Sequence, residues 1–158
     1  MVYMDPEALG TDPIYQSWLE QFHKDTEKMR PEFRRLYDLL FIPCVEFLRR
    51  QCAEPVPSVD ANLCQSLMNI IDVLLKPFTL NDTLDEEEQL TPKVSFFIAT
   101  SIFCGEDFQD LYTSSESVFI FALIWSLGAT TNSAGRKRFD TFLRINMKQL
   151  GLNGTFYI

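Results

Sequence analysis

The chain has 158 residues, a length that suits one domain or one domain with a short appendage. Apolar residues make up 46% of it and aromatic residues 13%, so we expect a large core and exclude disorder along the whole chain. The formal net charge of −8 argues against a nucleic-acid or anionic-membrane binder, because both classes carry an excess of Lys and Arg.

The four cysteines form no Cys-x-x-Cys pair, and the single histidine is His23. A zinc site needs four ligands at close spacing, so we expect buried, reduced thiols and no metal site. Asp5 and Pro6 interrupt any signal-peptide pattern at the N-terminus. The apolar run around Trp125 is far shorter than the ~20 residues that a membrane-spanning helix needs. The composition therefore predicts a soluble intracellular protein.

The first helix is predicted to begin where Asp12, an N-cap residue, is followed by Pro13 at the first helical position. Residues 1–11 before it are an extended entry, in which residues 1–4 read as a short strand or an extended segment closed by Asp5-Pro6 and by Gly10. The apolar face of the helix is expected at Ile14, Trp18 and Phe22, with Tyr15 and Leu19 beside them.

Two further helical patterns follow, separated by the stiff segment 54–57, which reads Glu-Pro-Val-Pro. Pro43 lies inside the first pattern and should kink or split that helix, because proline removes a backbone hydrogen bond. Ser58 or Asp60 is expected to cap the second pattern, and Pro77 to end it. The apolar positions are Phe33, Leu36, Tyr37, Leu40, Phe41, Cys44, Phe47 and Leu48, then Leu63, Leu67, Ile70, Ile71, Leu74 and Leu75.

The segment 79–91 is polar and acidic, with the run Asp85–Glu88 at its centre. Blocks of like charge are typical of solvated loops, and the order of residues does not match a calcium-binding loop. The following segment, Val94–Phe103, is apolar, and periodicity alone cannot separate helix from strand in it. Because its neighbours are helical, we expect a helix.

The residues from Phe119 to Gly128 form an apolar run that a short polar segment separates from a basic amphipathic helix. This pattern predicts a helix-turn-helix hairpin with a fully buried first arm. Ser114 or Ser115 is expected to cap that arm, with Glu116 favourably placed in its first turn. Gly128 is the expected C-cap.

The last helix is expected to begin at a cap formed by Asn132 or Ser133 and to end at Gly151. After it, residues 155–158 are prone to form a strand. The whole chain is thus predicted to be an all-α bundle of about five to seven helices with short extended segments at both ends. One face of the last helix carries Phe139, Phe142, Leu143 and Met147, and Asp140 and Arg144 form an i, i+4 pair.

No combination of residues indicates a catalytic, cofactor-binding or metal site. The stretch from Gly128 to Gly135 resembles a phosphate-binding loop only superficially, because six residues separate the glycines and Arg136 replaces the lysine. Lys137 and Arg138 extend a basic group that we expect on a solvated face or against another domain.

The remaining polar residues lack the partners that catalysis requires. His23 has no Cys or Asp partner at a recurring spacing. Four serines lack the context of a nucleophile elbow, and the last of them is expected to bond to the preceding helical turn: Ser101, Ser114, Ser115 and Ser126.

The sequence pattern F-x-F-x-L-I-W-S-L-G from Phe119 to Gly128, followed by R-F-D-T-F-L-R up to Arg144, resembles a pattern in axonemal dynein heavy chains. The match is to the C-terminal helical (lid) subdomain of the second AAA module of their motor ring. The phrase M-V-Y-x-x-P-x-x-L-G at residues 1–10 and the Ser-Trp pair at Trp18 are similar to the preceding part of that module. Further features fall in the same order: Pro43, Phe47, the segment 54–57 and the helix containing Ser66 and Leu67.

This resemblance implies that residues 1–11 lead out of a missing large AAA subdomain, 12–151 form the lid with the acidic loop 79–91, and 152–158 begin the connection to the next module. It implies a ciliary motor that binds ATP or ADP elsewhere, with no cofactor in this segment. The implied partners are neighbouring AAA subdomains of the same heavy chain, and, through the parent, microtubules and dynein light and intermediate chains. The implied location is the cytoplasm, the cytoskeleton and the ciliary axoneme.

AAA lids often carry a sensor arginine near the start of the helix equivalent to residues 117–128, and this chain has no basic residue there. Contact with a nucleotide γ-phosphate is therefore not expected, and the resemblance implies a non-catalytic, mechanical subdomain that transmits ATP-driven movement around the ring. Such a piece should expose an apolar patch where a neighbour docks. The alternative is a free-standing α-helical adaptor that binds a partner helix. An independent enzyme is nearly excluded by the thin catalytic inventory.

Overall fold

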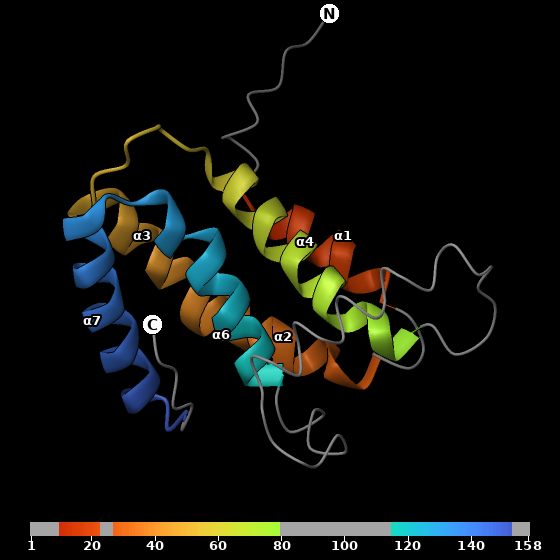
Figure 1. Ribbon diagram of the computed structural model, residues 1–158. Helices are drawn as coiled ribbons and strands as arrows, with labels where there is room; N and C mark the ends of the chain where they lie inside the picture. The colour runs from red at the N-terminus through yellow and green to blue at the C-terminus, as the bar shows by residue number, and fades with distance from the viewer. Residues whose placement is uncertain (1–9, 23–26, 80–114, 153–158) are drawn as a thin grey trace, which may run out of the picture.

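The computed structural model describes residues 10–22, 27–79 and 115–152, and over these ranges the chain is helical with no strand (Figure 1). The predicted all-α class is confirmed. The segments expected at the two ends, the acidic loop and Val94–Phe103 lie mostly or wholly outside the described residues. The elements are α1 (Asp12–Glu20), η2 (Glu27–Met29), α2 (Arg30–Leu36), η3 (Tyr37–Phe41), α3 (Ile42–Gln51), α4 (Asp60–Thr79), α6 (Ser115–Ser126), η5 (Gly128–Thr130) and α7 (Ser133–Gln149).

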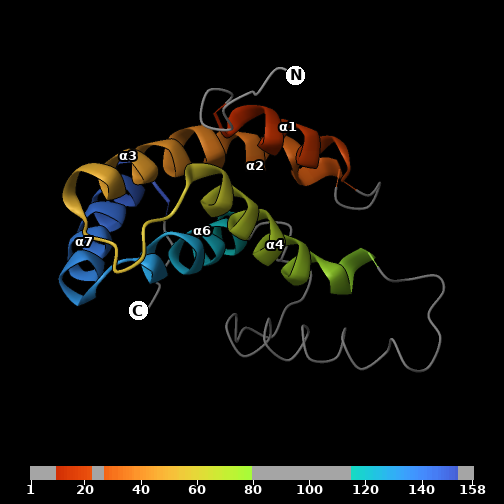
Figure 2. The same cartoon turned by 90° about the horizontal axis from the view of Figure 1, so that it is seen from above.

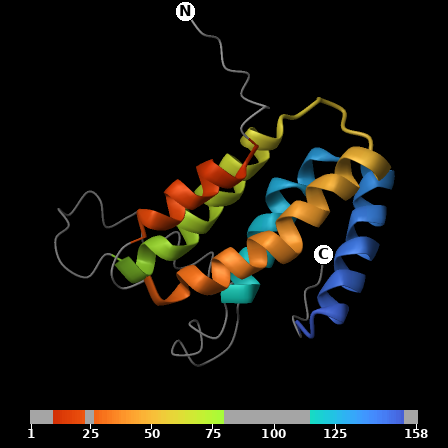
Figure 3. The same cartoon turned by 180° about the vertical axis from the view of Figure 1, so that it is seen from behind.

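Helices α2 and α3 are joined without interruption through η3, a single wide turn of π-helix (Figure 3). In this turn the Ile42 N–H bonds to the carbonyl of Tyr37, five residues earlier. Pro43 follows immediately and cannot donate a backbone hydrogen bond. The disruption expected at this proline thus takes the form of a π-turn, and the helix is not split in two.

The core lies between the α2–η3–α3 helix on one side and α4 with α6 on the other (Figure 2). Every apolar position predicted for α2, η3, α3 and α4 is buried except Phe47 and Ile70, which are half-buried. Helix α7 lies at the edge of the molecule and packs on α3 and η5. The periodicity therefore identified the core correctly in this part of the chain.

The inward face of helix α1 is centred on the residues that the sequence placed beside the predicted apolar face, and of the predicted face itself Ile14 is the residue that turns outward. Tyr15 and Leu19 are fully buried, whereas Ile14 is 37% exposed. The direction is set by contacts with distant residues, because the Tyr15 ring stacks on Tyr37 at 3.9 Å. Trp18 and the nearby Phe22 are half-buried against the core.

The start of α1 lies one residue away from its predicted position. Thr11 occupies the N-cap position, and Asp12 is the first helical residue. The Thr11 hydroxyl makes no capping bond, since it forms a 2.6 Å hydrogen bond with the Tyr37 hydroxyl. Asp12 accepts an ion pair from Arg34 at 2.6 Å. Tertiary contacts have therefore taken both side chains that could have capped the helix.

Helix α4 continues through Pro77 to Thr79, so the predicted end at this proline was wrong. A proline in the last turn removes one hydrogen bond, whereas α4 packs along α1 and α6 over much of its length. The packing outweighs the loss.

The prediction of a fully buried first arm for the hairpin was wrong on one side of α6. Phe121 and Ile124 are half-buried, and Trp125 is 57% exposed. These three residues follow an i, i+3, i+4 pattern, so they lie on one side of the helix. We call this apolar surface the α6 strip. The remaining apolar residues of α6 are buried against α4 and α2.

Gly128 does not cap α6, because its φ is not positive and it begins the short η5 turn. Its role is steric: a Cβ at this position would lie 3.3 Å from the Phe139 ring. Asn132 caps α7 as predicted, by accepting a 2.7 Å bond from the Gly135 N–H. Gly151 also ends α7 as predicted, with a φ of 70°.

Candidate docking surfaces

Of the residues weighed for catalysis, His23, Ser101 and Ser114 lie outside the described ranges. The Ser126 hydroxyl donates to the Leu123 carbonyl at 3.3 Å within the helix, as expected. Within the described ranges no group of three His, Cys, Asp or Glu side chains could hold a metal ion. None of the helices described here is long and apolar enough to cross a membrane.

The described thiols are poor nucleophiles. Burial raises the pKa of Cys44 to about 12 and that of Cys64 to about 12. Burial also raises the pKa of Cys52, which donates to the Gly135 carbonyl at 3.6 Å. Because the thiolate is the reactive form, these cysteines serve as packing groups at neutral pH.

The glycines at 128 and 135 do not form a phosphate cradle. A Cβ at Gly135 would lie 3.0 Å from the Cβ of Thr131, so the loop is already closely packed. The Gly135 N–H is bonded to Asn132 and therefore does not face an anion. The Asn132 N–H bonds to the Ala53 carbonyl at 3.0 Å, which joins the turn to the loop after α3.

Arg49 ties together α3, the following loop and the start of α4. Its guanidinium contacts Glu54 at 2.6 Å and Asp60 at 2.5 Å, and it donates to the Ser58 carbonyl at 2.8 Å. Burial alone would raise the pKa of Glu54, but hydrogen bonds from Ser58 and the charge of Arg49 outweigh burial and lower that pKa. The cluster holds the segment 54–60 in one conformation.

A hollow of about 390 Å³ opens beside this cluster, lined by Gly10, Thr11, Arg49 and the segment 58–61. Its arginine is already paired with two carboxylates. A nucleotide phosphate would therefore have to compete with both of them for the cation. This geometry gives no reason to assign the hollow to a nucleotide.

The basic residues at the start of α7 differ from the other arginines. Arg136 donates to the Thr131 carbonyl at 3.2 Å, and Arg138 donates to the Gln51 carbonyl at 3.1 Å. Neither has a carboxylate partner among the described residues. Both guanidinium groups are therefore held in place by backbone carbonyls, with no described carboxylate to neutralise their charge. Six other described arginines each contact a carboxylate: Arg30, Arg34, Arg35, Arg49, Arg50 and Arg144.

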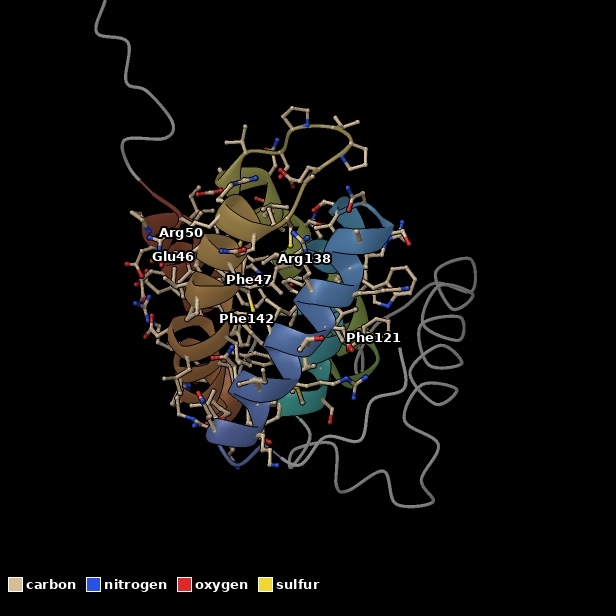
Figure 4. All side chains as sticks on the ribbon, turned by 90° about the vertical axis from the view of Figure 1, so that its left-hand side faces the viewer. Glu46, Phe47, Arg50, Phe121, Arg138 and Phe142 are labelled. Atoms are coloured by element: carbon tan, nitrogen blue, oxygen red, sulfur yellow. The ribbon has the colours of Figure 1, made fainter. Side chains whose placement is uncertain are left out.

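An aromatic surface lies where α3 and α7 meet (Figure 4). The rings of Phe47 and Phe142 stack with their centroids 4.1 Å apart, and both side chains are half-buried. Arg138 lies at one end of this pair, and Arg50 forms an ion pair with Glu46 at 3.7 Å on the α3 side. Ile145 comes one helical turn after Phe142 and is 52% exposed. We call Phe47, Arg50, Arg138, Phe142 and Ile145 the α3–α7 face.

The fold is thus a helical unit whose described part has two partly exposed apolar surfaces and no catalytic group that can be assigned. Residues 33–157 match the family model described as "Dynein heavy chain AAA lid domain". The chain belongs to this family of AAA lid domains.

Several relatives of the chain are axonemal dynein heavy chains. It is 30% identical over 150 residues to dynein axonemal heavy chain 1 of Homo sapiens, 28% over 145 residues to dynein axonemal heavy chain 3 of Mus musculus, and 30% over 148 residues to dynein axonemal heavy chain 12 of Rattus norvegicus. These matches cover 94%, 91% and 91% of this chain. The chain spans only 3–4% of the length of these relatives. No solved structure matches the chain.

Proposed function

We propose that the chain is the non-catalytic lid of the second AAA module of an axonemal dynein heavy chain, and that it transmits ATP-driven movement around the motor ring. The observation that carries the proposal is the lid-family match over 33–157 in a chain whose axonemal relatives match it over more than nine-tenths of its length. The assignment to the second module rests on the order of the motifs, from M-V-Y-x-x-P at residues 1–6 to the hairpin.

In this proposal residues 1–11 lead from the large subdomain, 12–151 form the lid and 152–158 begin the next connection. Nucleotide binds elsewhere in the heavy chain. The direct partners are neighbouring AAA subdomains, while microtubules and the light and intermediate chains are reached through the parent protein. The site of action is the ciliary axoneme.

A mechanical role is supported by how α6 begins. Its first turn bears Glu116, which pairs with Arg35 at 3.5 Å, and has no cation that could contact a phosphate. The Arg49 cluster and the Asn132–Ala53 bond connect loops to helices. A unit packed in this way can rotate as a rigid body and pass the rotation to whatever it touches.

The α3–α7 face supports a docking role, because it combines the stacked rings of Phe47 and Phe142 with Arg138, which has no carboxylate partner among the described residues. Interface cores are enriched in aromatic residues and arginine. The free-standing adaptor would use the same surface, but the family match over 33–157 favours the lid.

The test is an axonemal dynein heavy chain containing this segment, with Arg138→Glu and Ile145→Asp introduced together. We expect basal ATP hydrolysis to persist, since in this proposal the lid itself binds no nucleotide. Microtubule gliding should slow several-fold, because the double variant loses the contact between the lid and a neighbouring subdomain. Lys148→Glu, a charge reversal at an exposed position on the same helix, is the matched control. Unchanged gliding in the double variant would remove this face from the proposal.

A further inference from the structure

Arg138 is a cation of the α3–α7 face whose charge the described part of the chain does not neutralise. Its Nη1 donates to the Gln51 carbonyl at 3.1 Å, and this bond holds the guanidinium at one end of the Phe47–Phe142 pair (Figure 4). The remaining N–H groups of the guanidinium find no acceptor within residues 10–22, 27–79 and 115–152. Because the side chain is exposed, these donors are open to a partner.

Carboxylates on α7 and in the loop after α3 already have cationic partners of their own. Asp140, the acidic residue of α7, pairs with Arg144 at 2.8 Å. Glu54 pairs with Arg49 at 2.6 Å. An anion that neutralises Arg138 therefore has to come from outside the described part of the chain.

Helix α7 is basic although the chain as a whole is acidic. The helix has five basic residues and one acidic residue, whereas the chain has 14 basic and 22 acidic residues. Arg136, Lys137 and Arg138 follow one another near its N-terminus, the end at which the helix dipole favours anions and disfavours cations. The lid alone gains no stability from this arrangement, but an anionic neighbour would be attracted to it.

We propose that the α3–α7 face docks an acidic amphipathic segment of a neighbouring AAA subdomain, in which an Asp or Glu pairs with Arg138 and apolar side chains cover Phe142 and Ile145. The inference rests on the proposed function for the identity of the neighbour, whereas the chemistry of the contact comes from the face itself. A guanidinium and a carboxylate can form two parallel hydrogen bonds, which fixes the orientation of the partner as well as attracting it.

The spacing along α7 sets the pattern that the partner has to match. Arg138, Phe142 and Ile145 follow an i, i+4, i+7 order, so they lie along one side of the helix. At ~1.5 Å per residue, Phe142 is about 6 Å and Ile145 about 10 Å from Arg138 along the axis. A carboxylate and two apolar side chains within one short segment can therefore make all three contacts.

The composition of the face favours an acidic protein segment over a polyanion. Ile145 is 52% exposed and Phe142 is half-buried, and a nucleic acid or a phosphate-rich surface would leave this apolar area in water. A polyanion is bound by several cations at once. On this face Arg50 is already paired with Glu46, which leaves Arg138 as its cation without a described carboxylate.

The proposal is tested by zero-length cross-linking in an axonemal dynein heavy chain containing this segment, without microtubules. Arg138→Lys keeps the charge and supplies an amine, which a carbodiimide joins to a carboxylate only when the two groups touch. After mapping by mass spectrometry, we expect a link from position 138 to an Asp or Glu of another AAA subdomain. Lys148, exposed on the same helix, is the control and should give no link to that carboxylate. Links from position 138 only to the lid itself or to another polypeptide, or no link, would overturn the proposal.

A comparison of variants separates the charge of Arg138 from docking itself. Arg138→Gln should reproduce most of the several-fold slowing of microtubule gliding expected for Arg138→Glu with Ile145→Asp, whereas Arg138→Lys should keep most of the native speed. If the double variant slows gliding and Arg138→Gln does not, docking at this face stands and the acidic partner is overturned. If gliding is native in the double variant as well, the docking role in the proposed function fails. Circular dichroism identifies any variant that has unfolded.

Discussion

Gly151 ends α7 in a backbone conformation that residues other than glycine adopt only at a cost in free energy. Its φ is 70°, and the following Leu152 N–H bonds back to the Met147 carbonyl at 3.0 Å. The Gly151 N–H bonds to the Lys148 carbonyl at 3.3 Å, which completes a Schellman motif. Leu152 and Met147 are both buried, so the motif also attaches the end of α7 to the core.

We expect Gly151→Ala to lower the free energy of unfolding by about 1–2 kcal/mol, because an L side chain in the left-handed region costs that much and nothing around the site would clash. Chemical denaturation measures the change. Gly151→Asn is the control and should lose less, since asparagine tolerates this conformation better than alanine. Equal losses in the two variants would show that the backbone angle is not the cause.

Glu54 provides a prediction about pH. Its folded pKa is lowered from the ordinary value of 4.5, so its ionised form stabilises the folded chain above that pH, and this stabilisation is lost as pH falls through the folded pKa. The difference in unfolding free energy between the native chain and Glu54→Gln should therefore be largest near pH 7 and shrink below pH 4.5. Denaturation at a series of pH values checks this. Glu46→Gln, at an exposed ion pair, is the control and should show little difference.

At the scale of the helices, the position of α7 depends on α3. The stacked rings of Phe47 and Phe142 join the two helices, with an angle of 9° between the ring planes. Phe139 and Leu143, on another side of α7, are buried in the core. Two sets of apolar side chains thus hold the helix: Phe139 and Leu143 in the core, and Phe142 against Phe47. The side of α7 that carries Phe142 remains partly exposed.

A double-mutant cycle with Phe47→Leu and Phe142→Leu should give a coupling energy of about 1 kcal/mol, since aromatic pairs contribute ~0.5–1.5 kcal/mol beyond the area they bury. Urea denaturation of the four proteins measures it. The cycle of Phe142→Leu with Phe22→Leu, whose ring packs on Trp18 and Phe33, is the control and should be additive. Additive losses at Phe47 and Phe142 would mean that the stacking contributes nothing of its own.

At the scale of the whole molecule, the described residues form a packed helical unit in which long-range contacts join the first helix to the rest. The Trp18 indole donates to Asp72 on α4 at 2.9 Å, and the Tyr15 hydroxyl donates to the Phe33 carbonyl at 3.0 Å. At the hollow beside Arg49, the positive charge of the guanidinium is already paired with the carboxylates of Glu54 and Asp60. In the function proposed above, nucleotide binds elsewhere in the heavy chain, so we expect the isolated lid to have little affinity for it.

Millimolar ATP with Mg²⁺ should therefore leave the melting temperature of the isolated chain unchanged within about 1 °C, because a ligand that does not bind the folded state cannot stabilise it. Differential scanning fluorimetry makes the measurement, with an ATP-binding AAA module as the positive control. A concentration-dependent rise of several degrees would place a nucleotide site in this segment.

The sequence by itself determined the features that depend on residues a few positions apart. Helical periodicity predicted the core residues of α2, α3 and α4. The sequence also predicted Asn132 or Ser133 as the cap of α7 and Gly151 as its end. A capping bond or a positive φ is a local property, so neighbouring residues suffice to predict it.

Contacts between distant residues were decided only by the tertiary structure. Stacking of Tyr15 on Tyr37 sets which side of α1 is buried. A glycine is needed at position 128 because a Cβ there would come too close to the ring of Phe139. Nothing in the described structure covers Trp125 fully. The pairing of Phe47 with Phe142 likewise joins helices 95 positions apart in the chain. Periodicity indicates that a residue is apolar on a helix face, but which face meets another helix depends on how all the helices pack together.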